Sequence, residues 1–190
     1  MTDEEQVRIV REKVAELLKG NFDGHDLAHT ERVFKNACII REKEQKGDLK
    51  FIKTAALLHD ADDHKIFDTR DNSNARKILA SAGFSKREED EICEIINAVS
   101  FSKNKGKRPE RIEAAIVQDA DRLDAMGAIG IARTFAYGGK HGRSIEDSLQ
   151  HFYDKLLHLK DGLNTDAAKM LAEKRHELLV RFVEEMKEEL

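Results

Sequence analysis

Apolar residues recur at helical spacing along almost the whole chain, and this pattern leaves little room for anything but helices. Near the N-terminus, Val7, Val10, Val14 and Leu17 fall on one face of a helix. The chain contains a single proline, Pro109, and we find no convincing alternation of apolar and polar residues of the kind that indicates a strand. The sequence therefore predicts an all-α fold, built as a helical bundle.

Capping signals and glycines place the helix ends. A capping box at Thr2 and Glu5 opens the first helix, and Ser85 with Glu88 makes another. Further helices are expected over about Asp26–Glu44, Leu49–His59 and Asn74–Ala82, and others begin at Pro109, Ser144 and Thr165. Loops are expected over Asp62–Ser73, Ser102–Arg108 and Tyr137–Arg143, the last containing Gly138 and Gly139. In the final helix, Met170 and Leu171 are predicted to face inward.

Composition narrows the class of protein. The 190 residues suit one domain, and 33 basic against 37 acidic residues argue against a strong nonspecific nucleic-acid binder. No apolar run approaches the roughly 20 residues of a membrane span, and the N-terminus lacks the apolar region of a signal peptide. Cys38 and Cys93 stand far apart, which favours reduced core cysteines in a cytoplasmic protein over a thiolate metal site or a disulfide.

A histidine and an aspartate end the most apolar predicted helix. His59 and Asp60 follow the run Phe51–Leu58, and burying such a pair without partners would cost several kcal/mol. His29 occupies the inward stripe of the preceding helix, four residues before Val33. Either histidine alone would fit an ordinary core position better than a metal site. The adjoining Asp60 favours a bound metal ion, because an acid at a helix C-terminus opposes the helix dipole.

A third segment, residues 119–124, supplies acids. Asp121 and Asp124 share the helical face of Val117, whereas Asp119 points the other way. We therefore expect Asp121 to be the metal ligand and Asp119 to be either a surface residue or a supporting one. Imidazole nitrogens with carboxylate oxygens suit a hydrolytic transition-metal centre better than a closed thiolate zinc site.

The order His29, His59-Asp60, Asp121 resembles the H…HD…D motif of the HD superfamily of metal-dependent phosphohydrolases. The similarity covers roughly residues 20–185 and is closest to a bacterial branch of that superfamily. The stretches that carry it are residues 25–33, 57–60, 117–130 (VQDADRLDAMGAIG) and 151–157. The resemblance implies one HD-type domain over residues 1–190, with a metal-site region at about 20–135 and C-terminal helices at about 144–190.

The resemblance also implies the cofactor and the site. His29, His59, Asp60 and Asp121 would hold one divalent ion, Mn²⁺ first, with Fe²⁺, Co²⁺, Ni²⁺ or Mg²⁺ as alternatives. Such an ion lowers the pKa of bound water and polarises a phosphoryl oxygen. Around it, Asp63 would orient or deprotonate the water and His25 would protonate a leaving group or hold substrate, while Lys65 and Arg122 would contact phosphates. Asp63 and Lys65 equally fit a plain solvated loop.

The substrate implied by the resemblance is a nucleotide. Cleavage of a nucleoside triphosphate to monophosphate and pyrophosphate is the first expectation, followed by a 5′-nucleotidase or other phosphomonoesterase, and then by a cyclic-nucleotide phosphodiesterase. Two other classes stay open: a non-catalytic nucleotide-binding module, and a structural helical protein with core histidines. The sequence does not select the base, the native metal or an oligomeric state.

Overall fold

The computed structural model describes residues 1–20, 26–64, 66–99 and 107–190, and every regular element in these ranges is a helix, which confirms the all-α prediction. The α-helices are α1 (Asp3–Leu17), α2 (Leu27–Glu44), α3 (Leu49–Leu58), α4 (Ser73–Ser81), α5 (Lys86–Val99), α7 (Ile112–Asp124), α8 (Gly127–Lys140), α9 (Ile145–Asp154) and α10 (Asp166–Glu189). Two short 3₁₀ helices, η1 (Leu156–His158) and η2 (Lys160–Gly162), join α9 to α10.

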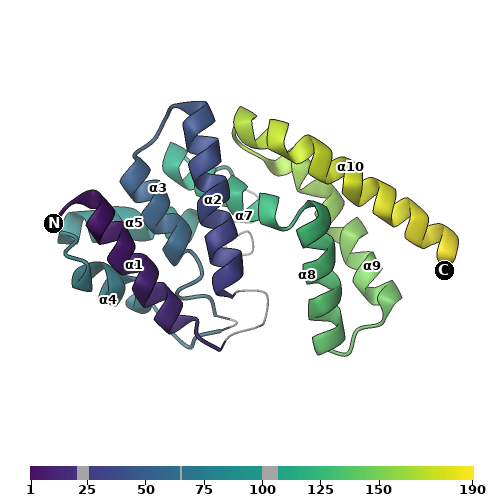
Figure 1. Ribbon diagram of the computed structural model, residues 1–190, viewed down its shortest axis with the longest axis horizontal. Helices are drawn as coiled ribbons and strands as arrows, with labels where there is room; N and C mark the ends of the chain where they lie inside the picture. Colours follow the sequence, from purple (N-terminus) through teal and green to yellow (C-terminus); the bar gives the residue numbers. More distant parts are fainter. Residues whose placement is uncertain (21–25, 65, 100–106) are drawn as a thin grey trace.

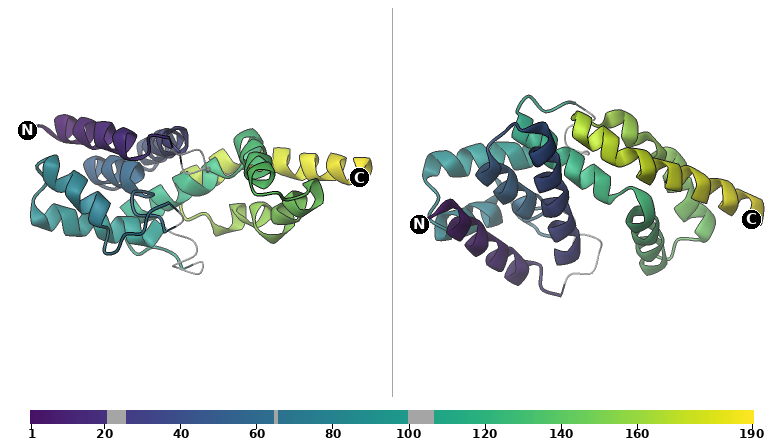
Figure 2. Two further views of the ribbon diagram at one scale, coloured as in Figure 1. Left: turned by 90° about the horizontal axis from the view of Figure 1, so that it is seen from below. Right: turned by 45° about the horizontal axis from the view of Figure 1, so that its top comes forward.

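The helices gather at two ends of an elongated molecule, with α7 between them. Helices α1 to α5 lie at the end that carries the N-terminus, and α8, α9 and α10 lie at the end that carries the C-terminus (Figure 1). The same division is seen in two further views (Figure 2). Helix α7 contacts α2, α3 and α5 on one side and α8 and α10 on the other, so it connects the two groups.

The core is deepest around α3 and α7. Residues Thr54 to Leu58 of α3 are all buried, and so are residues 114–120 of α7. A helix buried around its whole circumference can present polar side chains to the protein interior on any face. The acids of α7 therefore meet other helices rather than water.

Most of the predicted helix starts are confirmed. The Thr2–Glu5 capping box is present, and Ser144 and Thr165 cap α9 and α10. At the start of α2, the Asp26 carboxylate accepts a hydrogen bond of 2.7 Å from the His29 backbone N–H. This cap fixes His29 in the first turn of α2.

Four details differ from the sequence prediction. Pro109 precedes α7, whose N-cap is Arg111, because a proline suits the extended segment before a helix as well as its first turn. The predicted loop around Gly138 is helical in α8. Glycine at this position serves close packing rather than a turn, because a Cβ there would meet the Ser148 hydroxyl of α9. The chain also turns between α7 and α8, where Gly127 has φ +69°. Met170 is 71% exposed rather than inward, and Ala168 and Ala172 make the contact instead.

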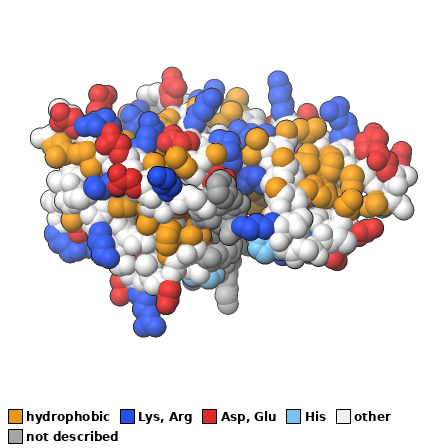
Figure 3. Space-filling view, turned by 60° about the horizontal axis from the view of Figure 1, so that its bottom comes forward, with side chains coloured by type: hydrophobic (Ala, Val, Ile, Leu, Met, Phe, Trp, Pro, Cys, Tyr) orange, Lys and Arg blue, Asp and Glu red, His pale blue; other side chains and the backbone are white. Residues whose placement is uncertain are grey.

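Charged residues of both signs share the surface. Basic and acidic side chains are interspersed over the face drawn in Figure 3. Among the helices of the described ranges, none combines the length and the apolarity that a membrane span requires.

Candidate metal centre

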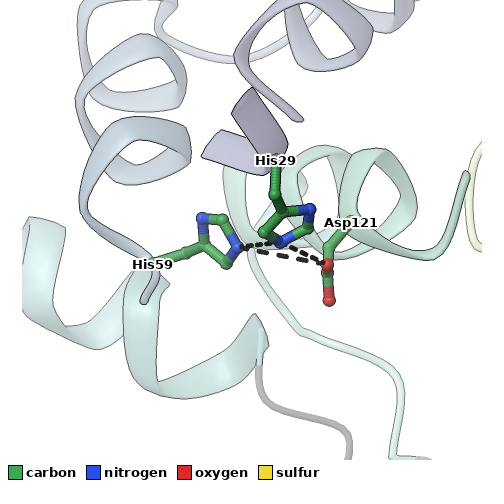
Figure 4. A group of neighbouring side chains, drawn as sticks. All are labelled: His29, His59 and Asp121. Carbon is green, nitrogen blue, oxygen red and sulfur yellow. Dashed lines mark hydrogen bonds and ion pairs between the residues drawn. The ribbon is translucent and has the colours of Figure 1, made fainter. Parts of the chain in front are cut away.

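Three helices bring two histidines and an aspartate to one point. His29 comes from α2, His59 directly follows α3, and Asp121 lies in α7; the three side chains point toward one another (Figure 4). One ligand atom from each lies within 4.8 Å of the others. The two Nε2 atoms are 3.2 Å apart, and Asp121 Oδ1 lies 3.5 Å from that of His29 and 4.0 Å from that of His59.

Asp60 borders the same point from the turn after α3. Its Oδ2 lies 3.4 Å from Nε2 of His29 and 3.4 Å from Nε2 of His59. Asp60 is 6% exposed, whereas the Asp121 side chain is 36% exposed. The structure thus brings together all four residues that the sequence marks as metal ligands, with the Asp121 side open to solvent.

The hydrogen bonds behind the two rings assign their tautomers. His59 Nδ1 lies 2.9 Å from the Ala56 carbonyl oxygen, and His29 Nδ1 lies 2.7 Å from Asp124 Oδ2. Both partners are acceptors, so each Nδ1 carries the hydrogen and each Nε2 of a neutral ring presents a lone pair. The two Nε2 atoms and the carboxylates of Asp60 and Asp121 therefore form a cluster of electron-pair donors.

A divalent cation fits this donor set. Nitrogen and carboxylate oxygen ligands without thiolates suit Mn²⁺, Fe²⁺, Co²⁺ or Zn²⁺. A proton binds to the same cluster. Burial by itself would lower the pKa of His29, but the hydrogen bonds to Asp124 and Asp60 outweigh that effect and raise it to about 9.

Asp124 lies behind His29, away from the cluster. Its Oδ1 accepts a hydrogen bond of 2.6 Å from Nε of Arg32, and its Oδ2 accepts one of 2.5 Å from Nη1 of Arg133. Burial opposes ionisation of this 2% exposed residue, yet the hydrogen bonds from His29 and Arg32 lower the pKa of Asp124. Asp124 therefore stays a carboxylate.

Asp119 lies within the protein, so the expectation of a surface position is wrong. It is fully buried, and its carboxylate accepts hydrogen bonds from the backbone N–H groups of Asn164 and Thr165, at 2.9 and 2.8 Å. The side chains of the same two residues donate as well, each at 2.8 Å. Asp119 fastens α7 to the N-terminus of α10, which the sequence pattern did not indicate because the partners lie 45 residues away.

The other predicted site residues are placed only in part. Asp63 lies one turn after Asp60, to whose carbonyl oxygen its backbone N–H donates at 3.2 Å, and its side chain is 20% exposed. Arg122 is buried and donates to the Gly162 carbonyl oxygen of η2. His25 and Lys65 lie outside the described residues. The roles of all four stay predictions.

Sequence reasoning missed two arginines, Arg32 and Arg133, that reach the carboxylate behind His29. Arg32 follows His29 by three residues, so helical spacing puts both on one face of α2, and this signal was available. Arg133 belongs to α8, nine residues after Asp124, beyond the turn that the sequence did not reveal.

Comparison with known proteins gives consistent matches. Residues 26–126 match the family model of the HD domain, and this range contains all four cluster residues. The chain is 40% identical to an uncharacterized protein of Bacillus subtilis, YpgQ, over 100% of its own length and 96% of the relative's.

Two solved structures share the fold over nearly their whole length. The crystal structure of Bacillus subtilis YpgQ in complex with ADP has a TM-score of 0.84 at 37% identity, covering 100% of this chain and 97% of that one. An HD-superfamily hydrolase from Bacillus thuringiensis has a TM-score of 0.81 at 39% identity, covering 99% and 98%.

Proposed function

The chain belongs to the HD-domain family, and from this premise we propose that it is a metal-dependent phosphohydrolase that acts on nucleotides. One observation carries the proposal: Nε2 atoms of His29 and His59 face each other at 3.2 Å with the carboxylates of Asp60 and Asp121 beside them. A bound divalent ion at such a site supplies an activated water and polarises a phosphoryl oxygen. We propose a single ion, Mn²⁺ first, held by these four residues.

The reaction we propose is hydrolysis of a nucleoside triphosphate. Water attacks the α-phosphorus, the bond from that phosphorus to the bridging oxygen breaks, and the products are a nucleoside monophosphate and pyrophosphate. Support for a nucleotide comes from YpgQ, a relative at 37% identity whose structure was solved in complex with ADP. Release of orthophosphate from a nucleoside monophosphate, the 5′-nucleotidase reaction, is the alternative, and a nucleotide-binding module without turnover is the rival from another class.

We assign the remaining roles to residues near the cluster. Asp63 orients the attacking water or accepts its proton, because it lies on the turn that carries Asp60. His25 donates a proton to the leaving group or holds substrate. Lys65 and Arg122 supply positive charge toward the phosphates, Arg122 from a guanidinium that also donates to the Gly162 carbonyl oxygen.

The proposal also includes the domain bounds and the cellular location. We propose that residues 1–190 form one HD-type domain, with the metal-site region at about 20–135 and the C-terminal helices at about 144–190. A cytoplasmic location is proposed from Cys38 and Cys93, which are both free thiols.

The test is a product screen against ribo- and deoxyribonucleotides with Mn²⁺, Mg²⁺, Co²⁺ and Ni²⁺. Pyrophosphate release from triphosphates, lost in Asp121→Asn, supports the proposal. The matched control is Asp166→Asn, which changes an aspartate whose side chain is 92% exposed, on α10. Orthophosphate from monophosphates would support the nucleotidase instead. Metal-loaded protein that binds nucleotide but releases neither product would replace the enzyme with the binding module.

A further inference from the structure

One buried carboxylate joins three helices immediately behind His29. Asp124 of α7 is 2% exposed, and it takes hydrogen bonds from His29 and Arg32 of α2 and from Arg133 of α8. We propose that Asp124 is a positioning residue of the metal centre: it fixes the tautomer and the orientation of His29, and the two arginines hold it in place. This inference rests on the proposed function only in taking the cluster to be a metal site.

The two histidines of the cluster are held in different ways. Nδ1 of His59 donates to a backbone carbonyl oxygen, that of Ala56, at 2.9 Å. Nδ1 of His29 instead faces a side-chain carboxylate at 2.7 Å. A carboxylate holds the proton on Nδ1 more strongly than a neutral carbonyl and makes Nε2 a stronger donor toward a metal. Of the two histidines, His29 is therefore the one whose donor strength depends on a side-chain carboxylate.

The two arginines hold the Asp124 carboxylate from two different helices. Nε and Nη2 of Arg32 lie 2.6 and 3.1 Å from its two oxygens, and Nη1 of Arg133 lies 2.5 Å from Oδ2. Charge-assisted bonds of this kind have defined directions, so they set the plane of the carboxylate. The orientation of the carboxylate in turn fixes the orientation of the His29 ring, through the hydrogen bond from Nδ1.

This arrangement links the C-terminal helices to the metal cluster. Arg133 belongs to α8, which lies with α9 and α10 at the far end of the molecule from α1 (Figure 1). Its guanidinium and the ring of His29 contact the same oxygen, Oδ2 of Asp124. A displacement of α8 would therefore change the position of the His29 ring through two hydrogen bonds, from Arg133 to Asp124 and from His29 to Asp124.

The test is Asp124→Asn, which keeps the shape of the side chain and removes its charge. Mn²⁺ affinity is measured by calorimetry without nucleotide. Loss of such a supporting group typically weakens metal binding by about 10- to 100-fold, and we expect a decrease of that size with helicity retained. Arg133→Gln leaves the hydrogen bond from His29 to Asp124 in place, so we expect it to lower Mn²⁺ affinity less than Asp124→Asn does.

The matched control is Asp119→Asn, a second fully buried acid of the same helix. It should lower thermal stability, while the folded protein should lose much less Mn²⁺ affinity than Asp124→Asn does. If Asp124→Asn binds Mn²⁺ as tightly as wild type, the positioning role is overturned and the proposed function stands. If wild type itself binds no metal, the proposed function fails instead.

If Asp124→Asn does not fold, NMR spectroscopy of the histidine rings tests the positioning role of Asp124 instead. In wild-type protein labelled with ¹⁵N-histidine, with or without Zn²⁺ as a diamagnetic metal, we expect the His29 proton on Nδ1 and slow exchange of that proton with water. Arg133→Gln should speed the exchange. An Nδ1 of His29 that carries no proton, or exchanges as fast as an exposed ring, would overturn the proposal even if metal binds.

Discussion

Two aspartates two residues apart in α7 should give opposite phenotypes when each is replaced by alanine. Asp119 is fully buried and fastens α10, whereas Asp121 has a side chain 36% exposed at the metal cluster. Asp119→Ala should therefore destabilise the metal-free protein and weaken metal binding and hydrolysis less than Asp121→Ala. Asp121→Ala should abolish both and leave the metal-free fold nearly unchanged.

The size of the first effect follows from the donors that lose their acceptor. Four donors of Asn164 and Thr165 point at the Asp119 carboxylate. Asn164 is half-buried and water can replace its partner, but Thr165 is 5% exposed, so its N–H and hydroxyl are stranded. At about 1–3 kcal/mol for each of these two buried unsatisfied groups, the loss is about 2–6 kcal/mol. For a chain of this length, the melting temperature should fall by about 4–24 °C.

The assay is thermal and urea unfolding in a chelator, followed by Mn²⁺ titration of the folded variants. Asp121→Ala should change metal-free stability by no more than about 0.5 kcal/mol, as is usual for a half-exposed side chain. Wild-type stability in Asp119→Ala would refute the structural role of that carboxylate. Metal binding that survives in Asp121→Ala and is lost in folded Asp119→Ala would refute the assignment of the cluster.

Further predictions concern metal, pH, catalysis and packing. Mn²⁺ at about 100 times its dissociation constant should stabilise the fold by about 2.7 kcal/mol, seen as a rise in melting temperature; no rise, with no metal by elemental analysis, would contradict the site. The pKa of His29 is raised from 6.5 to about 9, so its proton stabilises the metal-free fold fully below pH 6.5 and this contribution is lost as pH rises to about 9. Because metal must displace that proton, Mn²⁺ affinity by calorimetry should fall about tenfold for each pH unit below about 9; a flat profile would argue against it. Asp63→Asn should lower kcat by about 10²–10⁴-fold with metal still bound, and an unchanged kcat would exclude it as the base. Gly138→Ala, whose Cβ meets the Ser148 hydroxyl, should lower unfolding free energy by about 1–3 kcal/mol, while a neutral effect would show that α8 and α9 can separate.

Local sequence patterns predicted most of the fold. Apolar spacing and caps predicted the bounds of α2 and α3 to within a residue, since a cap such as Asp26 and a stripe such as that of Val33 are both encoded within one or two turns. The same spacing placed Asp121 on the face that joins the cluster. These features depend on residues close in sequence, and sequence reasoning reaches them.

What the sequence did not reveal depends on distant contacts. The turn between α7 and α8 requires the positive φ of Gly127, next to Arg175 of α10. Gly138 lies in a helix and allows close packing against Ser148 of α9. The dipeptide Gly138-Gly139 by itself indicates a loop and does not reveal that contact. Helical spacing assigned Asp119 and Asp124 to different faces of α7, but it did not reveal their partners. The contacts in α10 and α8 show that Asp119 fastens two helices and that Asp124 lies beside the metal cluster.

Anomalous diffraction from crystals grown with Mn²⁺ tests the central claim most directly. The account predicts one strong anomalous peak in each chain, bonded to Nε2 of His29 and His59 and to carboxylate oxygens of Asp60 and Asp121. Absence of a peak between these side chains in Mn²⁺-saturated crystals, or a peak bound instead through Asp119, would contradict it.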